Sequence, residues 1–206
     1  MGFLLMKSIL GLDISSSTIG FSILEYDDSQ IILKEYGHIK PPKKEGQSLS
    51  FRANEAMKIL EDFFKKKSPE AVASENYATR FSQGRSTANT IIVLSVFNEI
   101  TSISCMRALN IEPTKYAVIS IRSKLSKFSG SPISSKEECF DFITKYFTSF
   151  KIRFKKTGKI KDECFDEADA IAVALTHIIK ERENGKGPNL SKRGKTKTAR
   201  GSKKTS

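Results

Sequence analysis

The chain has 206 residues, of which 38% are hydrophobic and 28% are charged, and its formal net charge is +12 at pH 7. This length fits one domain of ordinary size with a real core plus tails, and the composition is that of a soluble globular protein. The N-terminal apolar patch is too short for a signal peptide or a membrane span, and we expect no other run to reach membrane length. These features argue against a secreted protein or a membrane partner.

Three cysteines, Cys105, Cys139 and Cys164, leave an odd count and have no close spacing. That arrangement argues against a disulfide framework or a zinc cluster. We therefore expect an intracellular, reducing compartment, either cytoplasm or another compartment that contains DNA.

The positive charge is concentrated at the C-terminal end. Residues 184–206 carry eight Lys and Arg and no acid, which leaves +4 for the rest of the chain. Because this stretch is also low in apolar residues, we predict a domain over 1–183 and a basic, disordered tail over 184–206. The basic excess indicates a polyanionic partner, most simply nucleic acid.

The predicted elements begin with a hairpin. Apolar runs at 9–14 and 19–24 flank a short polar link, a pattern typical of two neighbouring antiparallel strands. After a turn, 31–36 predicts a third antiparallel strand. Two prolines keep the following segment, 38–46, out of regular structure, so a basic loop is expected there.

The middle of the chain alternates helix and strand. Apolar residues recur at helical spacing over 50–67, and a short strand follows at 71–74. After the polar segment 76–86, the run 87–109 predicts a long helix that is apolar over much of its circumference. A single core covers only one stripe of a helix, so this helix is expected to be central or shared with a second subunit.

The last third predicts a core strand at 116–121, a serine-capped helix over 134–147, a basic and partly β-like excursion at 150–160, and a final helix at 162–183. The order β-β-β-α-β-α-β-α-α indicates an α/β fold. We expect a mixed five-stranded sheet, with three antiparallel hairpin strands and two parallel ones, flanked by helices on both faces.

Four acids stand out against this framework. Asp13 lies in the first apolar strand, and Glu75 directly follows a later one. Asp166 and Asp169 are three apart on the last helix and therefore share a face. Asp169 also falls in the apolar stripe that docks this helix, so its carboxylate should meet the sheet rather than water. A buried carboxylate is costly unless it is paired or binds a metal.

If the four acids converge, they need a cation. Two carboxylates about 4 Å apart repel by about 1 kcal/mol in water and about 4 kcal/mol at an effective dielectric of about 20. Oxygen ligands suit Mg²⁺, with Mn²⁺ as a substitute. A pair of such ions is a known arrangement for phosphodiester hydrolysis, so we expect two per active site.

The alternative interpretation of the acids is structural. Asp162, Glu163, Asp166 and Glu167 would form an acidic first turn that complements the helix dipole, and Glu75 would be a strand-end charge. We expect this for Glu163 and Glu167. It fails for Asp169, because a docking face is a poor place for an idle carboxylate.

Four segments carry a resemblance to a known family. In chain order they read ILGLDISSSTIGFSIL, ASENY, YAVISIRSKLSKFSG and FDEADAIAVALTH. Their order and spacing resemble the RuvC family of Holliday junction resolvases, in the ribonuclease H-like superfamily, over about residues 7–180. The resemblance implies a ribonuclease H-like fold and a Mg²⁺-dependent endonuclease that resolves four-way DNA junctions by paired nicks leaving 5′-phosphates.

The resemblance also assigns residues. It implies that Asp13, Glu75, Asp166 and Asp169 are the catalytic, metal-binding acids and that Arg122 lies near the scissile phosphate. Family members are homodimers, with the equivalent of the 87–109 helix in the interface. This chain departs from many bacterial members at Ile14 and Ser15, in the basic loop at 37–46, in the excursion at 150–161 and in the tail.

Aromatic and basic residues next to the predicted site are candidates for DNA binding. Aromatic rings can stack on unpaired bases, and Arg and Lys can hold phosphates. The candidates are Tyr77, Arg80, Phe81, Arg85, Arg122, Lys124 and Lys127. Further backbone contacts are expected among Lys40, Lys43, Lys44, Arg153, Lys155 and Lys156.

Three other functions fit parts of the pattern. A relaxed endonuclease would also cut flaps, three-way junctions and forks. An actin-like ATPase is suggested by Asp13 followed by Ser15 to Thr18 and Gly20, but that fold needs two similar halves and a second such loop, and the sequence has neither. A non-catalytic DNA-binding protein on the same fold would not need all four acids.

Overall fold

The computed structural model describes residues 6–43, 45–76 and 88–185. They form one mixed sheet of five strands in the order β3-β2-β1-β4-β5. Strands β1, β2 and β3 pair antiparallel, whereas β4 and β5 run parallel to β1. The strands are β1 (Lys7–Ile14), β2 (Ile19–Tyr26), β3 (Ile31–Ile39), β4 (Ala71–Glu75) and β5 (Thr114–Tyr116). The predicted sheet is confirmed.

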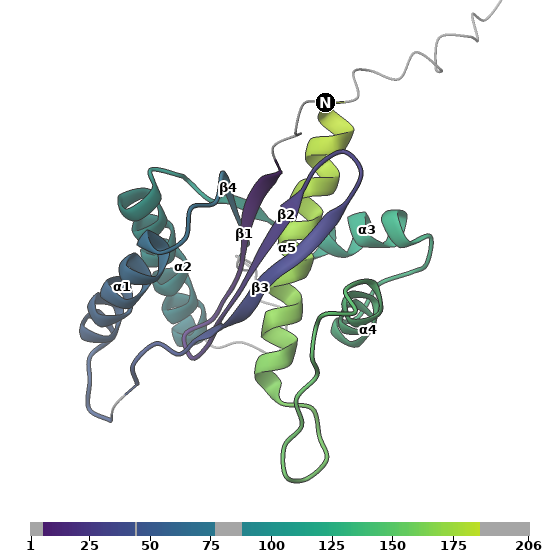
Figure 1. Ribbon diagram of the computed structural model, residues 1–206. Helices are drawn as coiled ribbons and strands as arrows, with labels where there is room; N and C mark the ends of the chain where they lie inside the picture. The colour runs from purple at the N-terminus through teal and green to yellow at the C-terminus, as the bar shows by residue number, and fades with distance from the viewer. Residues whose placement is uncertain (1–5, 44, 77–87, 186–206) are drawn as a thin grey trace, which may run out of the picture.

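Helices cover both faces of this sheet (Figure 1). One face carries α1 and α2, and the other carries α5 with α3 and α4 beside it. The helices are α1 (Leu49–Lys65), α2 (Ala88–Leu109), α3 (Val118–Ser129), α4 (Lys136–Tyr146) and α5 (Asp162–Gly185). The expected arrangement, with helices on both faces, is therefore also confirmed.

Alternation along β1 separates two cores. Leu10 and Leu12 pack with α1 and α2, around Leu60 and Phe97, whereas Ile9 packs with α5 on the opposite face. Successive side chains of a strand point to opposite faces, so Asp13 lies on the same face as Ile9. The first strand therefore directs its carboxylate toward α5.

Two glycines let α5 approach the sheet closely. A Cβ at Gly11 would stand 2.2 Å from the carbonyl oxygen of Ala170, and one at Gly20 would stand 2.2 Å from that of Asp166. Between them, the buried hydroxyl of Ser22 donates a hydrogen bond to the Ala170 oxygen at 3.0 Å. Larger residues at these positions would push away the segment of α5 that carries Asp166 and Asp169.

Two local predictions were wrong. The run predicted as a strand at 116–121 contributes only Tyr116 to β5, and Val118–Ser129 is helix α3. The apolar, β-branched run YAVISI resembles a strand, but Ile121 and Leu125 use helical spacing to bury one stripe against the core. The loop predicted at 38–46 begins later, because β3 continues through Ile39.

Helix α2 corrects the expectation that no run reaches membrane length. Its 22 residues are long and apolar enough, by length and composition alone, to cross a membrane. In the described part of the chain this is the one such helix. It packs against α1 and buries polar side chains as well as apolar ones, Asn98, Thr101, Ser102 and Ser104 among them, as a core helix does.

Candidate active site

Asp13 and Glu75 lie side by side at the ends of two parallel strands. The β1–β4 register pairs Leu12 with Ser74, so the next residue on each strand is one of the two acids. Ala73 packs in the α5-side core, and alternation places Glu75 on that same face. The two carboxylates therefore meet at one edge of the sheet, under α5.

Helix α5 adds the other two acids. Asp166 and Asp169 share the face of α5 that meets the sheet, and both contact the ammonium group of Lys136. The Lys136 Nζ lies 2.9 Å from Asp169 Oδ2 and 3.4 Å from Asp166 Oδ1. Asp13, more than 150 positions earlier in the chain, lines the same cavity as Lys136 and Asp169.

Burial and mutual repulsion favour the protonated forms of these acids. Desolvation, and then repulsion from Glu75 and Asp169, raises the pKa of Asp13 well above its usual value. Burial, followed by the charge of Asp169, raises the pKa of Glu75 to about 7. Burial likewise raises the pKa values of Asp166 and Asp169, although Lys136 opposes the change. The four acids can therefore be deprotonated together only if positive charge lies next to them.

Two cationic side chains supply some of that charge. Burial lowers the pKa of Lys136, but attraction to Asp169, Asp13 and Asp166 outweighs it and the net pKa is raised. Arg122 lines the same cavity, of about 180 Å³, together with Asp13, Glu75, Asp169 and Lys136. Its guanidinium donates to the Ser134 carbonyl oxygen at 2.7 Å, which fixes it at the rim.

The donor set has the chemistry that a hard divalent cation requires. All four acids offer oxygen ligands, as Mg²⁺ and Mn²⁺ prefer. Among the described residues, no three His, Cys, Asp or Glu side chains already stand close enough together to form a metal-binding group. Lys136 instead provides a positive charge at the carboxylates, which a bound cation would complement or displace.

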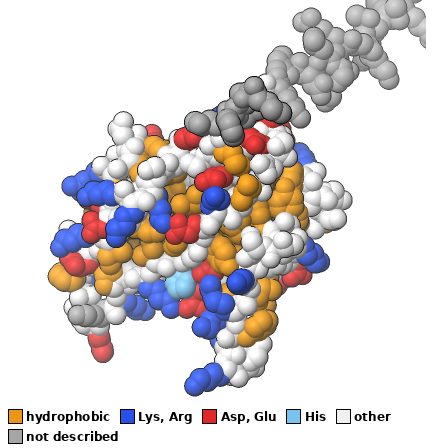
Figure 2. Space-filling model, viewed as in Figure 1, with side chains coloured by type: hydrophobic (Ala, Val, Ile, Leu, Met, Phe, Trp, Pro, Cys, Tyr) orange, Lys and Arg blue, Asp and Glu red, His pale blue; other side chains and the backbone are white. Residues whose placement is uncertain are grey.

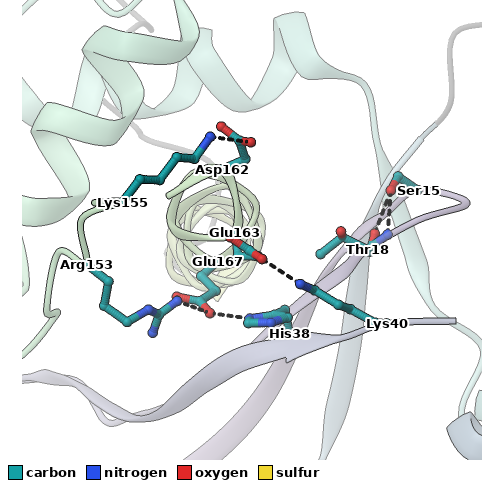
Figure 3. A network of polar contacts seen from close by, with 9 residues as sticks. All are labelled: Ser15, Thr18, His38, Lys40, Arg153, Lys155, Asp162, Glu163 and Glu167. Carbon is teal, nitrogen blue, oxygen red and sulfur yellow. Dashed lines mark hydrogen bonds and ion pairs between the residues drawn. The ribbon is translucent and has the colours of Figure 1, made fainter. Parts of the chain in front are cut away.

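Glu167 corrects the expectation of a surface charge in the first turn of α5. Its side chain is fully buried. Both of its oxygens accept hydrogen bonds from Arg153 at 2.6 Å, and His38 Nδ1 lies 2.8 Å from Oε1. Figure 3 shows Arg153 and His38 approaching Glu167 from opposite sides. Glu167 therefore ties α5 to β3 and to the segment before the helix.

The predicted DNA-binding residues have mixed outcomes. Tyr77, Arg80, Phe81 and Arg85 lie outside the described residues. Lys124 is paired with Glu183 of α5, and Lys127 is exposed in the last turn of α3. Of the predicted DNA contacts in the described part of the chain, Arg122 is the one that lines the carboxylate cavity.

Sequence reasoning missed Lys136, although a signal was available. Ser135 caps α4 through a complete capping box, so Lys136 is the first residue of this helix. A cation is unfavourable there because the helix dipole is positive at its N-terminus. A lysine at such a position needs a compensating anion, and Asp166 and Asp169 provide it.

This sheet order, with helices on both faces, defines the class of fold as ribonuclease H-like α/β, and acids lie at two adjacent strand ends and on the last helix. Comparison with known proteins shows which proteins this chain resembles. No family model matches the chain. However, it is 28% identical over 173 residues to the crossover junction endodeoxyribonuclease RuvC of Finegoldia magna, covering 83% of this chain and 92% of the relative.

Solved structures agree on the fold. RuvC of Thermus thermophilus in complex with a Holliday junction substrate superposes with a TM-score of 0.62 at 16% identity, covering 86% of this chain and 96% of that one. The yeast mitochondrial Holliday junction resolvase superposes with a TM-score of 0.54 at 14% identity, covering 86% and 82%. The resemblance to RuvC is thus confirmed, at low sequence identity.

Proposed function

We propose that this chain is a structure-selective endodeoxyribonuclease that resolves four-way DNA junctions by paired, metal-dependent nicks that leave 5′-phosphates. One observation carries the proposal: Asp13, Glu75, Asp166 and Asp169 gather at one edge of a sheet whose fold is that of RuvC. The curated relative is a crossover junction endodeoxyribonuclease. A non-catalytic DNA-binding protein would not need this costly cluster of half-buried acids.

In this proposal the four acids hold Mg²⁺, with Mn²⁺ as a substitute and two ions per active site. A metal pair, when bound, supplies water activation and stabilises the leaving oxygen. Arg122 and Lys136 orient the scissile phosphate at the cavity and balance its charge. The deprotonated carboxylates bind the metal, so protons compete with it.

Paired nicks need two active sites, and helix α2 supports a homodimer. Ile92, Ile103 and Met106 on α2 are 56%, 38% and 43% exposed. Such an apolar strip is favourable only when another surface covers it. We infer that α2 of a second copy packs here, which places two equivalent sites in one particle for the two strands of a junction.

The acids are tested with Asp166→Asn. This change keeps the size of the side chain but removes its charge, and it should slow cleavage of a labelled four-way junction by at least about a hundredfold, the loss typical for one electrostatic group in a reacting site. Binding of the junction, measured without divalent metal, should be retained. Cleavage at the parent rate would refute the proposal.

A panel of substrates separates strict from relaxed selectivity. Four-way junctions, three-way junctions, flaps and linear duplex of matched sequence are incubated with the parent protein and Mg²⁺. Preferential cleavage of the four-way junction supports a resolvase. Equal rates on all branched substrates would indicate a relaxed branch-specific nuclease, and equal rates on linear duplex would contradict both.

A further inference from the structure

The segment between α4 and α5 folds as a small hairpin that projects from the molecule (Figure 1). Phe154 and Ile160 form an antiparallel bridge, and the backbone N–H of Lys155 donates to the Lys159 carbonyl at 2.7 Å. Gly158 closes the turn with φ of 78°, a left-handed conformation that glycine adopts without strain. We call residues 151–161 the basic hairpin.

The base of the basic hairpin is fixed to the domain. Arg153 reaches the fully buried Glu167 through two hydrogen bonds of 2.6 Å. The backbone N–H of Lys151 donates to the Tyr36 hydroxyl of β3 at 2.8 Å. These contacts join the base of the hairpin to α5 and to the edge strand β3, and Figure 3 shows the one between Arg153 and Glu167.

The basic hairpin carries a one-sided charge. It contains no acid and six basic residues, which are Lys151, Arg153, Lys155, Lys156, Lys159 and Lys161. Arg153 and Lys155 pair with acids of α5, whereas in the described part of the chain the other four form no ion pair and are exposed. Figure 2 shows Lys and Arg side chains gathered on the lower part of the molecule and at its lowest projection.

The acids around the base of the hairpin are neutralised. Lys155 Nζ lies 2.8 Å from Asp162 Oδ2, and Lys40 Nζ lies 2.6 Å from Glu163 Oε1 (Figure 3). The first turn of α5 therefore presents paired charges, and the unpaired lysines of the hairpin dominate the local potential. Such a surface attracts a polyanion.

An aromatic ring stands among these lysines. Phe154 is 58% exposed, and Ile152, two residues before it, is 37% exposed. Aromatic rings next to basic residues form platforms on which unpaired bases stack. Stacking on a base would give this exposed ring a role. A hairpin that contacts only solvent offers no reason for an exposed aromatic ring.

The basic hairpin also lies close to the carboxylates. It ends at Lys161, directly before α5 begins at Asp162, and Asp166 is four residues further along this helix, about 6 Å at the rise of an α-helix. Successive nucleotides of one strand are about 3.4 Å apart along a duplex. The base of the hairpin therefore lies within the span of a few nucleotides from the carboxylates of α5.

We propose that the basic hairpin is a DNA-binding arm that holds the branch next to the cleavage site. Lys156 and Lys159 bind phosphates, and Phe154 stacks on an unpaired base at the branch point. The arm rests on the proposed function, because it binds the same substrate beside the same site.

The proposed binding of phosphates by the hairpin lysines is tested by a double variant, Lys156→Ala/Lys159→Ala. Its matched control is Lys65→Ala/Lys66→Ala, which removes two exposed lysines from the end of α1 on the opposite face. Binding to a labelled four-way junction is followed by fluorescence anisotropy, without divalent metal, over a series of salt concentrations. Loss of two phosphate contacts should reduce the salt slope by about 2 and weaken Kd at least about fivefold, whereas the control should match the parent.

The ring is tested by Phe154→Ala against Phe51→Ala, a phenylalanine of α1 that is 50% exposed. Phe154→Ala should weaken binding to the junction at least about fivefold and leave binding to linear duplex unchanged, because a closed duplex offers no unpaired base. Phe51→Ala should change neither. Melting temperatures of all variants verify folding.

Two outcomes overturn the arm in distinguishable ways. If the parent prefers branched DNA but the hairpin variants keep its Kd and salt slope, the arm is wrong and the proposed function stands. If the parent itself does not prefer branched DNA to linear duplex, the proposed function fails and the arm fails with it.

Discussion

The two faces of the sheet pack against their helices in different ways. Under α1 and α2, the large side chains of Leu10 and Leu12 fill the space between sheet and helices. Under α5, Gly11 and Gly20 leave so little room that the helix backbone lies against the strands. Large apolar side chains fill the face under α1 and α2, whereas on the other face the backbone of α5 lies close to the strands. The carboxylates gather on the face where α5 lies close.

The largest effect on metal binding should come from a methyl group added at Gly20, on the face of the sheet that α5 covers. Gly20→Ala forces α5 away from β2, because its Cβ would lie 2.2 Å from the Asp166 carbonyl oxygen. Overpacking of this kind costs about 1–3 kcal/mol or more, and it should also abolish metal binding by displacing Asp166. Thermal unfolding and Mn²⁺ titration measure the two effects.

Leu60→Ala on the opposite face is the matched control. Leu60 is fully buried, and its truncation should cost about 2–5 kcal/mol. Its Mn²⁺ affinity should remain that of the parent. If Gly20→Ala keeps parental metal affinity, the distinction between the two faces is wrong.

The next largest effect is expected from replacing Lys136. Lys136→Met removes the ammonium that contacts Asp166 and Asp169, so at neutral pH the metal-free protein should lose about 1–2 kcal/mol of stability, because two half-buried carboxylates are left without their partner. Added Mg²⁺ should restore much of this loss. Lys124→Met, which breaks a surface pair with Glu183, should cost at most about 1 kcal/mol and gain nothing from Mg²⁺. Similar losses in the two variants would contradict the role given to Lys136.

The smallest effect concerns pH. Burial and the Asp169 charge raise the pKa of Glu75 from 4.5 to about 7, so the folded protein binds this proton more tightly than the unfolded chain does. The contribution of Glu75 to stability is therefore complete below its unfolded pKa and is lost as the pH rises through about 7. Because Mg²⁺ needs the carboxylate, it should raise Tm more at a pH of about 8 than at about 6. In Glu75→Gln, the Mg²⁺-induced rise in Tm should be similar at the two pH values. An equal rise in the parent protein at both pH values would contradict the role given to Glu75.

The sequence predicted the sheet and the four acids because both depend on local signals. Alternating apolar runs define β1 and β2, and a carboxylate inside an apolar strand or a docking stripe is conspicuous on its own. The burial of Glu167 could not be predicted from such local signals. Its burial depends on Arg153 and His38, which come from other segments and meet it only in the fold.

Lys136 and α3 were missed for related reasons. Lys136 looks like a solvated helix-start charge until α5 is placed next to it. The run that becomes α3 has strand-like composition, and only its packing shows that Ile121 and Leu125 share a helical stripe. The position of Lys136 at a helix start indicates that it needs an anion, but which acids supply that anion, and the helical state of α3, depend on the tertiary position of α5, which no local pattern encodes. The close approach of α5 over Gly11 and Gly20 belongs to the same category.

The central claim is that Asp13, Glu75, Asp166 and Asp169 form a single metal site, and direct titration with Mn²⁺ by calorimetry tests it. Asp13→Asn and Asp169→Asn should each weaken Mn²⁺ binding at least about tenfold, since charge count sets the affinity of carboxylate sites. Asp162→Asn, on the same helix but with an 83% exposed side chain paired to Lys155, should bind as the parent does. Parental affinity in Asp169→Asn, or an equal loss in Asp162→Asn, would contradict the account.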